Sequence, residues 1–69
     1  MFDKRKFMAQ MALAGVTLKD LAAHLGIDKS TLSRKISDDG RFTRKEINEM
    51  IDFLKIDDPA DIFFARQLA

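Results

Sequence analysis

Residues 17–37 read TLKDLAAHLGIDKSTLSRKIS, and this stretch predicts two short amphipathic helices joined by a turn. Gly26 follows the first helix at the position where a left-handed residue ends a helix, and Asp28 is expected to cap the second. Ala22 lies where the helices would cross, and its small side chain lets them approach closely. The stretch therefore predicts a helix-turn-helix. Apolar residues recur at helical spacing in both halves, at Leu18, Leu21, Ala22, Leu25, Leu32 and Ile36.

The outward face of the second helix carries only cations and hydroxyls. No acidic residue follows Asp28 in this segment. A face of this composition suits a polyanion better than a protein groove, because every side chain on it can donate a hydrogen bond. Its residues are Lys29, Ser30, Thr31, Ser33, Arg34, Lys35 and Ser37.

Short polar residues that precede helical patterns predict where the helices begin. They are Asp3, Thr17, Asp28, Thr43 and Asp58. We therefore predict an all-α chain that forms a single domain over residues 1–69, with helices at 4–14, 18–25, 29–37, 44–54 and 59–65. In the first helix, Phe7, Met8 and Met11 are the expected core face. The expected core of the whole domain comprises Phe7, Met11, Leu21, Ala22, Leu25, Ile27, Leu32, Ile36, Ile47, Ile51 and Leu54.

The composition restricts the class of function. The 69 residues include no cysteine and one histidine, His24, which we expect to be an exposed helical residue. Without a second histidine, a thiol, a nucleophile–base pair or a phosphate-binding glycine loop, we expect no metal, no cofactor, no small-molecule ligand and no enzymatic activity. No apolar run approaches the ~18 residues of a membrane span, so we expect a cytoplasmic protein without a membrane segment.

The net charge of +1 conceals an uneven distribution. Residues 1–45 contain ten Lys and Arg against five Asp and Glu, whereas residues 46–69 contain two against six. Basic charge thus gathers around the helix-turn-helix, as expected for a protein that approaches phosphate with one end. Chance segregation in a small protein is the alternative interpretation.

A second basic cluster lies at the start of the fourth expected helix, where Arg41, Arg44 and Lys45 surround the cap residue Thr43. Cations are unfavourable at a helix N-terminus unless an anion lies nearby, because the helix dipole is also positive there. A DNA phosphate would supply that anion and would also accept hydrogen bonds from the first-turn N–H groups. The alternative is a basic turn that is simply solvated.

The last expected helix carries three adjacent large apolar residues, Ile62, Phe63 and Phe64. Three successive residues span roughly 200° of a helix, so one core face does not bury all of them. The excess apolar surface indicates a partner, and the simplest partner is a second copy of the chain. The alternative is a short, partly unwound segment that packs all three onto the core.

A family resemblance rests on these same residues. The run from Thr17 through LAAHLGI to STLSR resembles the Cro/repressor (Xre-like) helix-turn-helix family. FTRKEINEMIDFLKIDDPADIFF, residues 42–64, resembles the helices that follow the motif in small phage-encoded members. Two positions depart from the family pattern: Leu18 stands where many members have a DNA-contacting Gln, and Lys35 occupies the usual apolar position, with Ile36 one place later. The resemblance implies a compact five-helix, lambda-repressor-like DNA-binding domain.

The resemblance further implies a sequence-specific regulator of transcription, a phage or prophage repressor or Cro-like protein. It would bind a pseudopalindromic double-stranded DNA operator as a homodimer, with residues 29–37 in the major groove. Base contacts are expected from Lys29, Ser30, Ser33 and Arg34. Phosphate contacts are expected from Thr17, Lys35, Ser37, Arg41, Thr43, Arg44 and Lys45. The alternative left open is a helical protein–protein interaction module, such as an antirepressor or assembly factor, which the Phe-rich tail favours.

Overall fold

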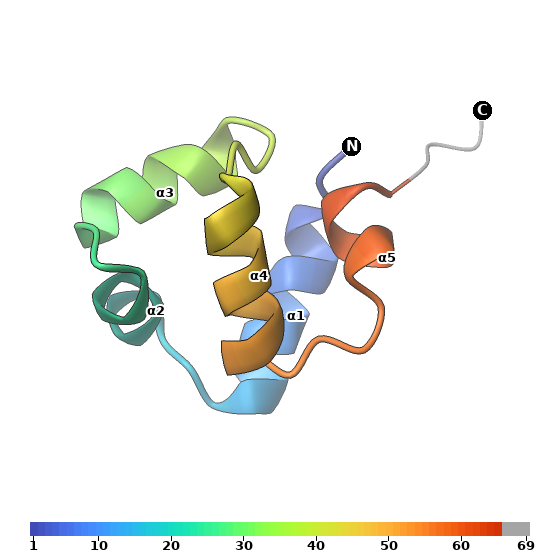
Figure 1. Cartoon of the computed structure of the whole chain (residues 1–69), viewed down its shortest axis with the longest axis horizontal. Helices are drawn as coiled ribbons and strands as arrows, with labels where there is room; N and C mark the ends of the chain where they lie inside the picture. Colours follow the sequence, from blue (N-terminus) through green and yellow to red (C-terminus); the bar gives the residue numbers. More distant parts are fainter. Residues whose placement is uncertain (66–69) are drawn as a thin grey trace.

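Five helices account for most of the chain in a computed structural model, which describes residues 1–65. They are α1 (Lys4–Ala14), α2 (Leu18–Leu25), α3 (Lys29–Ser37), α4 (Arg44–Phe53) and α5 (Pro59–Phe63), and no strand occurs within the described range. The predicted all-α architecture is confirmed, and every helix begins where the sequence predicts. α2 packs against α3 and α4, and α1 packs against α5 (Figure 1). Only the ends of α4 and α5 differ, by one and two residues, from the expected 54 and 65.

Local capping explains why the helices begin at these residues. Thr17 and Thr43 each form a complete capping box, with Asp20 and Glu46 as the reciprocal partners. The side chains of Asp3 and Asp58 also accept first-turn N–H groups. Asp28 differs from the expectation: it is the N-cap residue of α3, but its carboxylate makes no capping hydrogen bond.

The turn between α2 and α3 depends on Gly26. Its φ of 71° lies in the left-handed region, where a side chain is strained. The Gly26 N–H donates to the Ala23 carbonyl at 3.2 Å, and the Ile27 N–H donates to the Ala22 carbonyl at 3.0 Å. These bonds satisfy the last carbonyls of α2 and turn the chain into α3. Ala22 of α2 is buried, as the core prediction expects.

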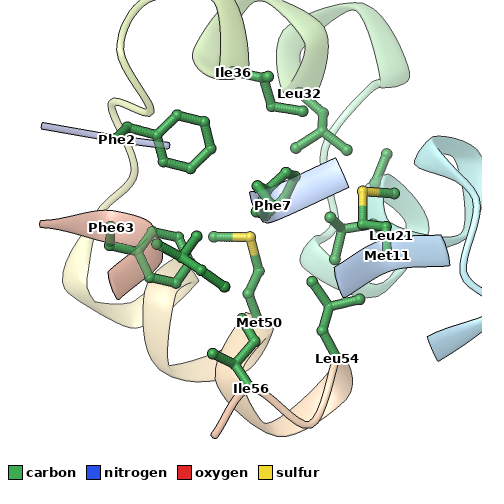
Figure 2. Close-up of a cluster of buried hydrophobic side chains, with 12 residues drawn as sticks. Phe2, Phe7, Met11, Leu21, Leu32, Ile36, Met50, Leu54, Ile56 and Phe63 are labelled. Carbon is green, nitrogen blue, oxygen red and sulfur yellow. The ribbon is translucent and has the colours of Figure 1, made fainter. Parts of the chain in front are cut away.

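Phe7 lies at the centre of the core. Figure 2 shows its ring between Leu32 and Ile36 of α3 on one side and Met50 of α4 on the other. The core prediction is confirmed for seven residues, which are buried: Phe7, Met11, Leu21, Ala22, Leu32, Ile36 and Leu54. The other four are partly buried and pack against this cluster: Leu25, Ile27, Ile47 and Ile51.

Met50 is buried, as expected from its place on the apolar stripe of the fourth helix, and four residues that were not expected in the core are buried as well: Phe2, Ile56, Ile62 and Phe63. Phe2 precedes α1, Ile56 follows α4, and Ile62 and Phe63 belong to the short helix α5, which packs against α1. The Asp3 N–H donates to the Ile62 carbonyl at 2.7 Å, which fixes the segment before α1 against α5. Met8 is a wrong core assignment, because 39% of its surface is exposed. It lies about 100° around α1 from Phe7, outside the stripe that Phe7 and Met11 form.

The apolar run of α5 divides between the core and the surface. Ile62 and Phe63 are each 6% exposed, so both are buried within their own chain. Phe64 is 65% exposed. This corrects the expectation that Ile62, Phe63 and Phe64 together provide an interface: in this fold only Phe64 is accessible to a partner.

An ion pair joins α3 to the first turn of α4. Lys35 Nζ lies 2.9 Å from Glu46 Oε1, and the two side chains are only 25% and 13% exposed. The same carboxylate oxygen accepts the Thr43 N–H at 2.8 Å. Burial of this carboxyl raises its pKa, but the hydrogen bonds from the Thr43 backbone and from Lys35 outweigh burial, so the pKa of Glu46 is lowered. Glu46 therefore contributes to the capping of α4 and to the orientation of α3.

Leu32→Ala tests the core. Leu32 is fully buried, and removing its side chain should lower the free energy of unfolding by about 2–5 kcal/mol through the lost burial and the cavity left behind. Leu13→Ala is the matched control, because Leu13 is a helical leucine that is 82% exposed, and its effect should stay within about 0.5 kcal/mol. Chemical denaturation measures both. Equal effects of the two substitutions would refute the assignment of Leu32 to the core.

Glu46→Gln tests the ion pair. Gln keeps an acceptor for the Thr43 N–H but removes the charge that faces Lys35, so the free energy of unfolding should fall by about 1 kcal/mol at pH 7. The pKa of Glu46 is lowered on folding, so this stabilisation is present above the unfolded-state pKa of about 4.3 and is lost as pH falls through the folded-state pKa. Denaturation of both proteins at pH 7 and near pH ~2 should therefore show the gap closing in acid.

Glu49→Gln is the control for this pH dependence. Glu49 lies on the same helix, and no ion pair involves it within residues 1–65. Its substitution removes the same charge but should not lower the free energy of unfolding at pH 7 by a comparable amount. A stability gap for Glu46→Gln that is the same at both pH values would mean that the charge of Glu46 does not stabilise the fold.

Candidate nucleic-acid interface

α3 lies at the edge of the molecule, with α4 beginning beside its C-terminal end (Figure 1). Leu32 and Ile36 anchor the inner side of α3 in the core. The outer side exposes Lys29, Ser30 and Arg34, and Ser37 is exposed at its end. Ser33 is partly buried at the border of this face. The helix therefore presents a continuous polar and basic surface.

The basic residues before and within the first turn of α4 are also exposed. Arg41 has 79% of its side chain exposed, and Arg44 and Lys45 are exposed at the start of the helix. Arg41 Nε lies 3.2 Å from Asp38 Oδ2 in a pair whose two side chains are both mostly in solvent. Such a pair contributes little to stability, so the guanidinium is free to exchange Asp38 for another anion at small cost.

A shallow hollow lies between α3 and the loop before α4. Arg34 of α3 and Arg41 of the loop both line it, along with Thr31, Lys35 and Asp38. Two guanidinium groups beside one hollow create a positive potential that attracts an anion, which the single carboxylate of Asp38 only partly offsets. The hollow thus places Arg34, a predicted base contact, beside Lys35 and Arg41, two of the predicted phosphate contacts.

Thr17 and Thr43 take part in capping, and this defines what their hydroxyls can bind. The Oγ1 atoms accept the Asp20 and Glu46 N–H groups, each at 3.1 Å. A threonine hydroxyl that accepts one hydrogen bond still has its own hydrogen to donate. The hydrogen bonds from the Thr17 backbone and side chain lower the pKa of Asp20, which keeps the cap of α2 charged. The hydroxyl hydrogens of Thr17 and Thr43 also take part in the hydrogen bonds that lower the pKa values of Asp20 and Glu46, so a phosphate bound by either hydroxyl would replace a hydrogen bond of its capping box.

Lys35 differs from the other predicted phosphate contacts, because its ammonium is already paired with Glu46. An ammonium has three donors, and the two that remain can still reach an anion. Its main role in this fold is to hold α3 against α4. This ion pair was missed by sequence reasoning, since eleven residues and a turn separate the partners and no helical spacing rule connects them.

His24 is exposed, as predicted, but it is not isolated. Its ring stacks on that of Phe53 with centroids 4.0 Å apart and an interplanar angle of 8°. This stack joins α2 to the end of α4. The sequence pattern of α2 alone did not distinguish His24 from a residue that contacts only solvent. Among the described residues, no three His, Cys, Asp or Glu side chains cluster closely enough to hold a metal ion. None of the described helices has the length and apolarity needed to cross a membrane.

Comparison with known proteins agrees with this geometry. The family model for the Cro/C1-type helix-turn-helix DNA-binding domain matches residues 6–65. No curated protein and no solved structure matches the chain. The matched range includes the helix-turn-helix, the exposed basic residues of the loop and α4, and all of α5. Because the match covers most of the chain, this protein belongs to the family of Cro/C1-type helix-turn-helix DNA-binding domains.

Proposed function

We propose that this chain is a sequence-specific regulator of transcription that binds double-stranded DNA with α3 in the major groove. One observation carries the proposal: α3 exposes Lys29, Ser30 and Arg34 while Leu32 and Ile36 on its inner side are buried in the core, so these groups are presented outward on one helix. A major groove about 12 Å wide admits an α-helix and offers a distinct pattern of donors and acceptors for each base pair. Membership of the family supports DNA as the partner.

The residues that would contact base edges are Lys29, Ser30, Ser33 and Arg34. Arg34 is the strongest candidate because its guanidinium can donate to O6 and N7 of one guanine together. Lys29 and Ser30 lie in the first turn of α3, the end that enters the groove in related docking geometries. Ser33 is at the border of the exposed face and would contact a neighbouring base or sugar.

Phosphate binding falls to groups on both sides of α3. Thr17 precedes α2, whereas Arg41, Thr43, Arg44 and Lys45 form the loop and first turn before and within α4. Ser37 and the free donors of Lys35 lie between them. Contacts from separate elements would fix the register of α3 on the duplex without reading its sequence.

We further infer that the protein acts as a homodimer and is a phage or prophage repressor or Cro-like protein. One helix of nine residues contacts too few base pairs for useful specificity, and a two-fold protein reads a two-fold site. Phe64, exposed at the end of α5, would lie in the interface, and half-sites would then be about 10 bp apart. Repression would follow from occupying the operator and excluding polymerase.

A protein-binding module is the rival proposal, and the exposure of Phe64 and Leu13 favours it. Selection of bound duplexes from a random DNA pool separates the two. Enrichment of a palindromic sequence supports an operator-binding regulator. Recovery of the unselected pool, with binding that depends only on salt, would exclude sequence-specific reading.

Arg34→Ala and Lys45→Ala separate base reading from phosphate anchoring. Arg34→Ala should cost about 1–3 kcal/mol on the selected operator and little on scrambled DNA. Lys45 is exposed in the first turn of α4, so Lys45→Ala should weaken both duplexes alike and reduce the salt slope by about one. Titration of each variant against both duplexes at several salt concentrations measures these effects.

Lys6→Ala is the charge-matched control for this pair. Lys6 Nζ lies 2.7 Å from Asp61 Oδ1 on α5, so its ammonium is already paired away from α3. Its loss should leave the preference for operator over scrambled DNA unchanged. If Arg34→Ala weakens both duplexes equally, Arg34 is only an electrostatic contact and does not read a base.

Phe64→Asp tests the dimer. A charge at this exposed position should prevent two copies from packing through α5, so the complex with operator should contain one protomer instead of two. Leu13→Asp is the control, because Leu13 is also exposed but lies at the far end of α1. Analytical ultracentrifugation with and without operator gives the masses. A Phe64→Asp complex with the mass of the wild-type complex would rule out the α5 interface.

A further inference from the structure

The segment before α1 packs against the loop between α3 and α4, although about forty residues separate them in the sequence. Phe2 is the residue that makes this contact. Its N–H donates to Asp39 Oδ1 at 3.3 Å, and its ring lies against Gly40. A Cβ atom at position 40 would overlap the Phe2 ring, so the absence of a side chain there is what admits Phe2. The Phe2 ring thus occupies the space that a side chain at position 40 would need.

The Phe2 ring is itself held firmly. It is 8% exposed and lies 5.3 Å from the ring of Phe7, 5.8 Å from that of Phe42 and 5.9 Å from that of Phe63, measured between centroids. Figure 2 shows Phe2 on the Phe63 side of Phe7, at the rim of the core. The Asp3 N–H bond to Ile62 fixes the backbone next to it. Phe2 therefore offers a rigid surface to the loop.

Two consecutive residues of the loop have left-handed backbones, and only Asp39 carries a side chain that this conformation strains. Asp39 has a φ of 55° and Gly40 a φ of 66°. The left-handed conformation costs a residue with a side chain roughly 1 kcal/mol, so it persists where the surroundings fix it. Phe2 contacts both residues, through the N–H bond to Asp39 and the ring on Gly40.

The loop that Phe2 supports leads directly to the phosphate-contacting groups. Arg41 follows Gly40, and its N–H donates to the Lys35 carbonyl at 3.2 Å. Phe42, whose ring contacts Phe2, precedes the cap residue Thr43. The position of the Arg41 guanidinium and of the first turn of α4 relative to α3 thus depends on the conformation of residues 39 and 40.

We propose that Phe2 is a positioning residue for DNA binding: it holds the Asp39–Gly40 turn so that Arg41 and the start of α4 meet the phosphate backbone. The inference rests on the proposed function, since it assigns Arg41 to a phosphate. Phe2 itself touches no DNA. Phe2 contributes to DNA binding only through the conformation of the loop. Replacing Phe2 by another apolar residue does not change the charge of the protein.

Phe2→Leu is the test variant, because Leu keeps an apolar side chain and the fold while losing the flat ring that fits Gly40. Ile56→Val is the control: Ile56 is buried in the same core but follows α4, away from the loop. Binding is measured at a temperature where both variants are fully folded by circular dichroism. Phe2→Leu should bind operator and scrambled duplex about tenfold more weakly and reduce the salt slope by about one, although no charge is removed. Ile56→Val should leave both quantities unchanged.

A double-mutant cycle with Arg41→Ala identifies the route of the effect. If Phe2 acts by placing Arg41, then Phe2→Leu should have little further effect on affinity in the Arg41→Ala background. Full additivity of the two substitutions would overturn the proposal. An affinity and salt slope for Phe2→Leu equal to those of Ile56→Val would overturn it as well.

A measurement without DNA keeps this inference separate from the proposed function. Amide hydrogen exchange of Arg41 reports directly on the loop, and Phe2→Leu should speed it about tenfold beyond any change in global stability. The Ile56 amide, which donates to the Ile51 carbonyl at 3.0 Å, should follow global stability only. Failure of the wild-type protein to bind any duplex would refute the proposed function. Unchanged Arg41 exchange in Phe2→Leu would refute the positioning role, whatever the DNA result.

Discussion

The contacts among four phenylalanine rings are the interaction on which the rest of the fold depends. Phe7 of α1 is fully buried, and its ring lies within 5.3–6.3 Å of those of Phe2, Phe42 and Phe63. These rings come from the segment before α1, the loop before α4, and α5. A chain of 69 residues can bury only a small core, and without cysteine it has no disulfide. It therefore relies on such large side chains to join segments that are distant in the sequence.

The recognition helix gains its orientation from this core without giving up its outer face. Leu32 and Ile36 are the only α3 residues that are buried, which leaves Lys29, Ser30, Arg34 and Ser37 exposed to solvent. Because only two side chains of this nine-residue helix are buried, apolar burial alone holds α3 weakly. The ion pair with Glu46 and the turn at Gly26 hold the two ends of α3 in compensation.

Sequence reasoning succeeded where the determining interactions are local. Four of the five helix starts follow from a side-chain cap within three residues, and the buried stripes of α2 and α3 follow from helical periodicity. It failed where burial depends on distant segments: Phe2, Ile62 and Phe63 are covered by tertiary contacts that no local pattern encodes. On the surface, the exposed basic groups were identified by charge and residue type.

Long-range polar and aromatic contacts escaped prediction for the same reason. The stack of His24 on Phe53 joins α2 to α4, and the hydrogen bonds from Gln10 Nε2 to the carbonyls of Leu54 and Lys55 join α1 to the residues that follow α4. At Lys35, where the sequence resemblance implies an apolar residue, the structure shows a polar contact to Glu46 instead. An apolar side chain there would stabilise α3 through burial alone, without a hydrogen bond to the first turn of α4. The charged hydrogen bond from Lys35 to Glu46 is directional, so it adds to the burial of Leu32 and Ile36 in holding the orientation of α3.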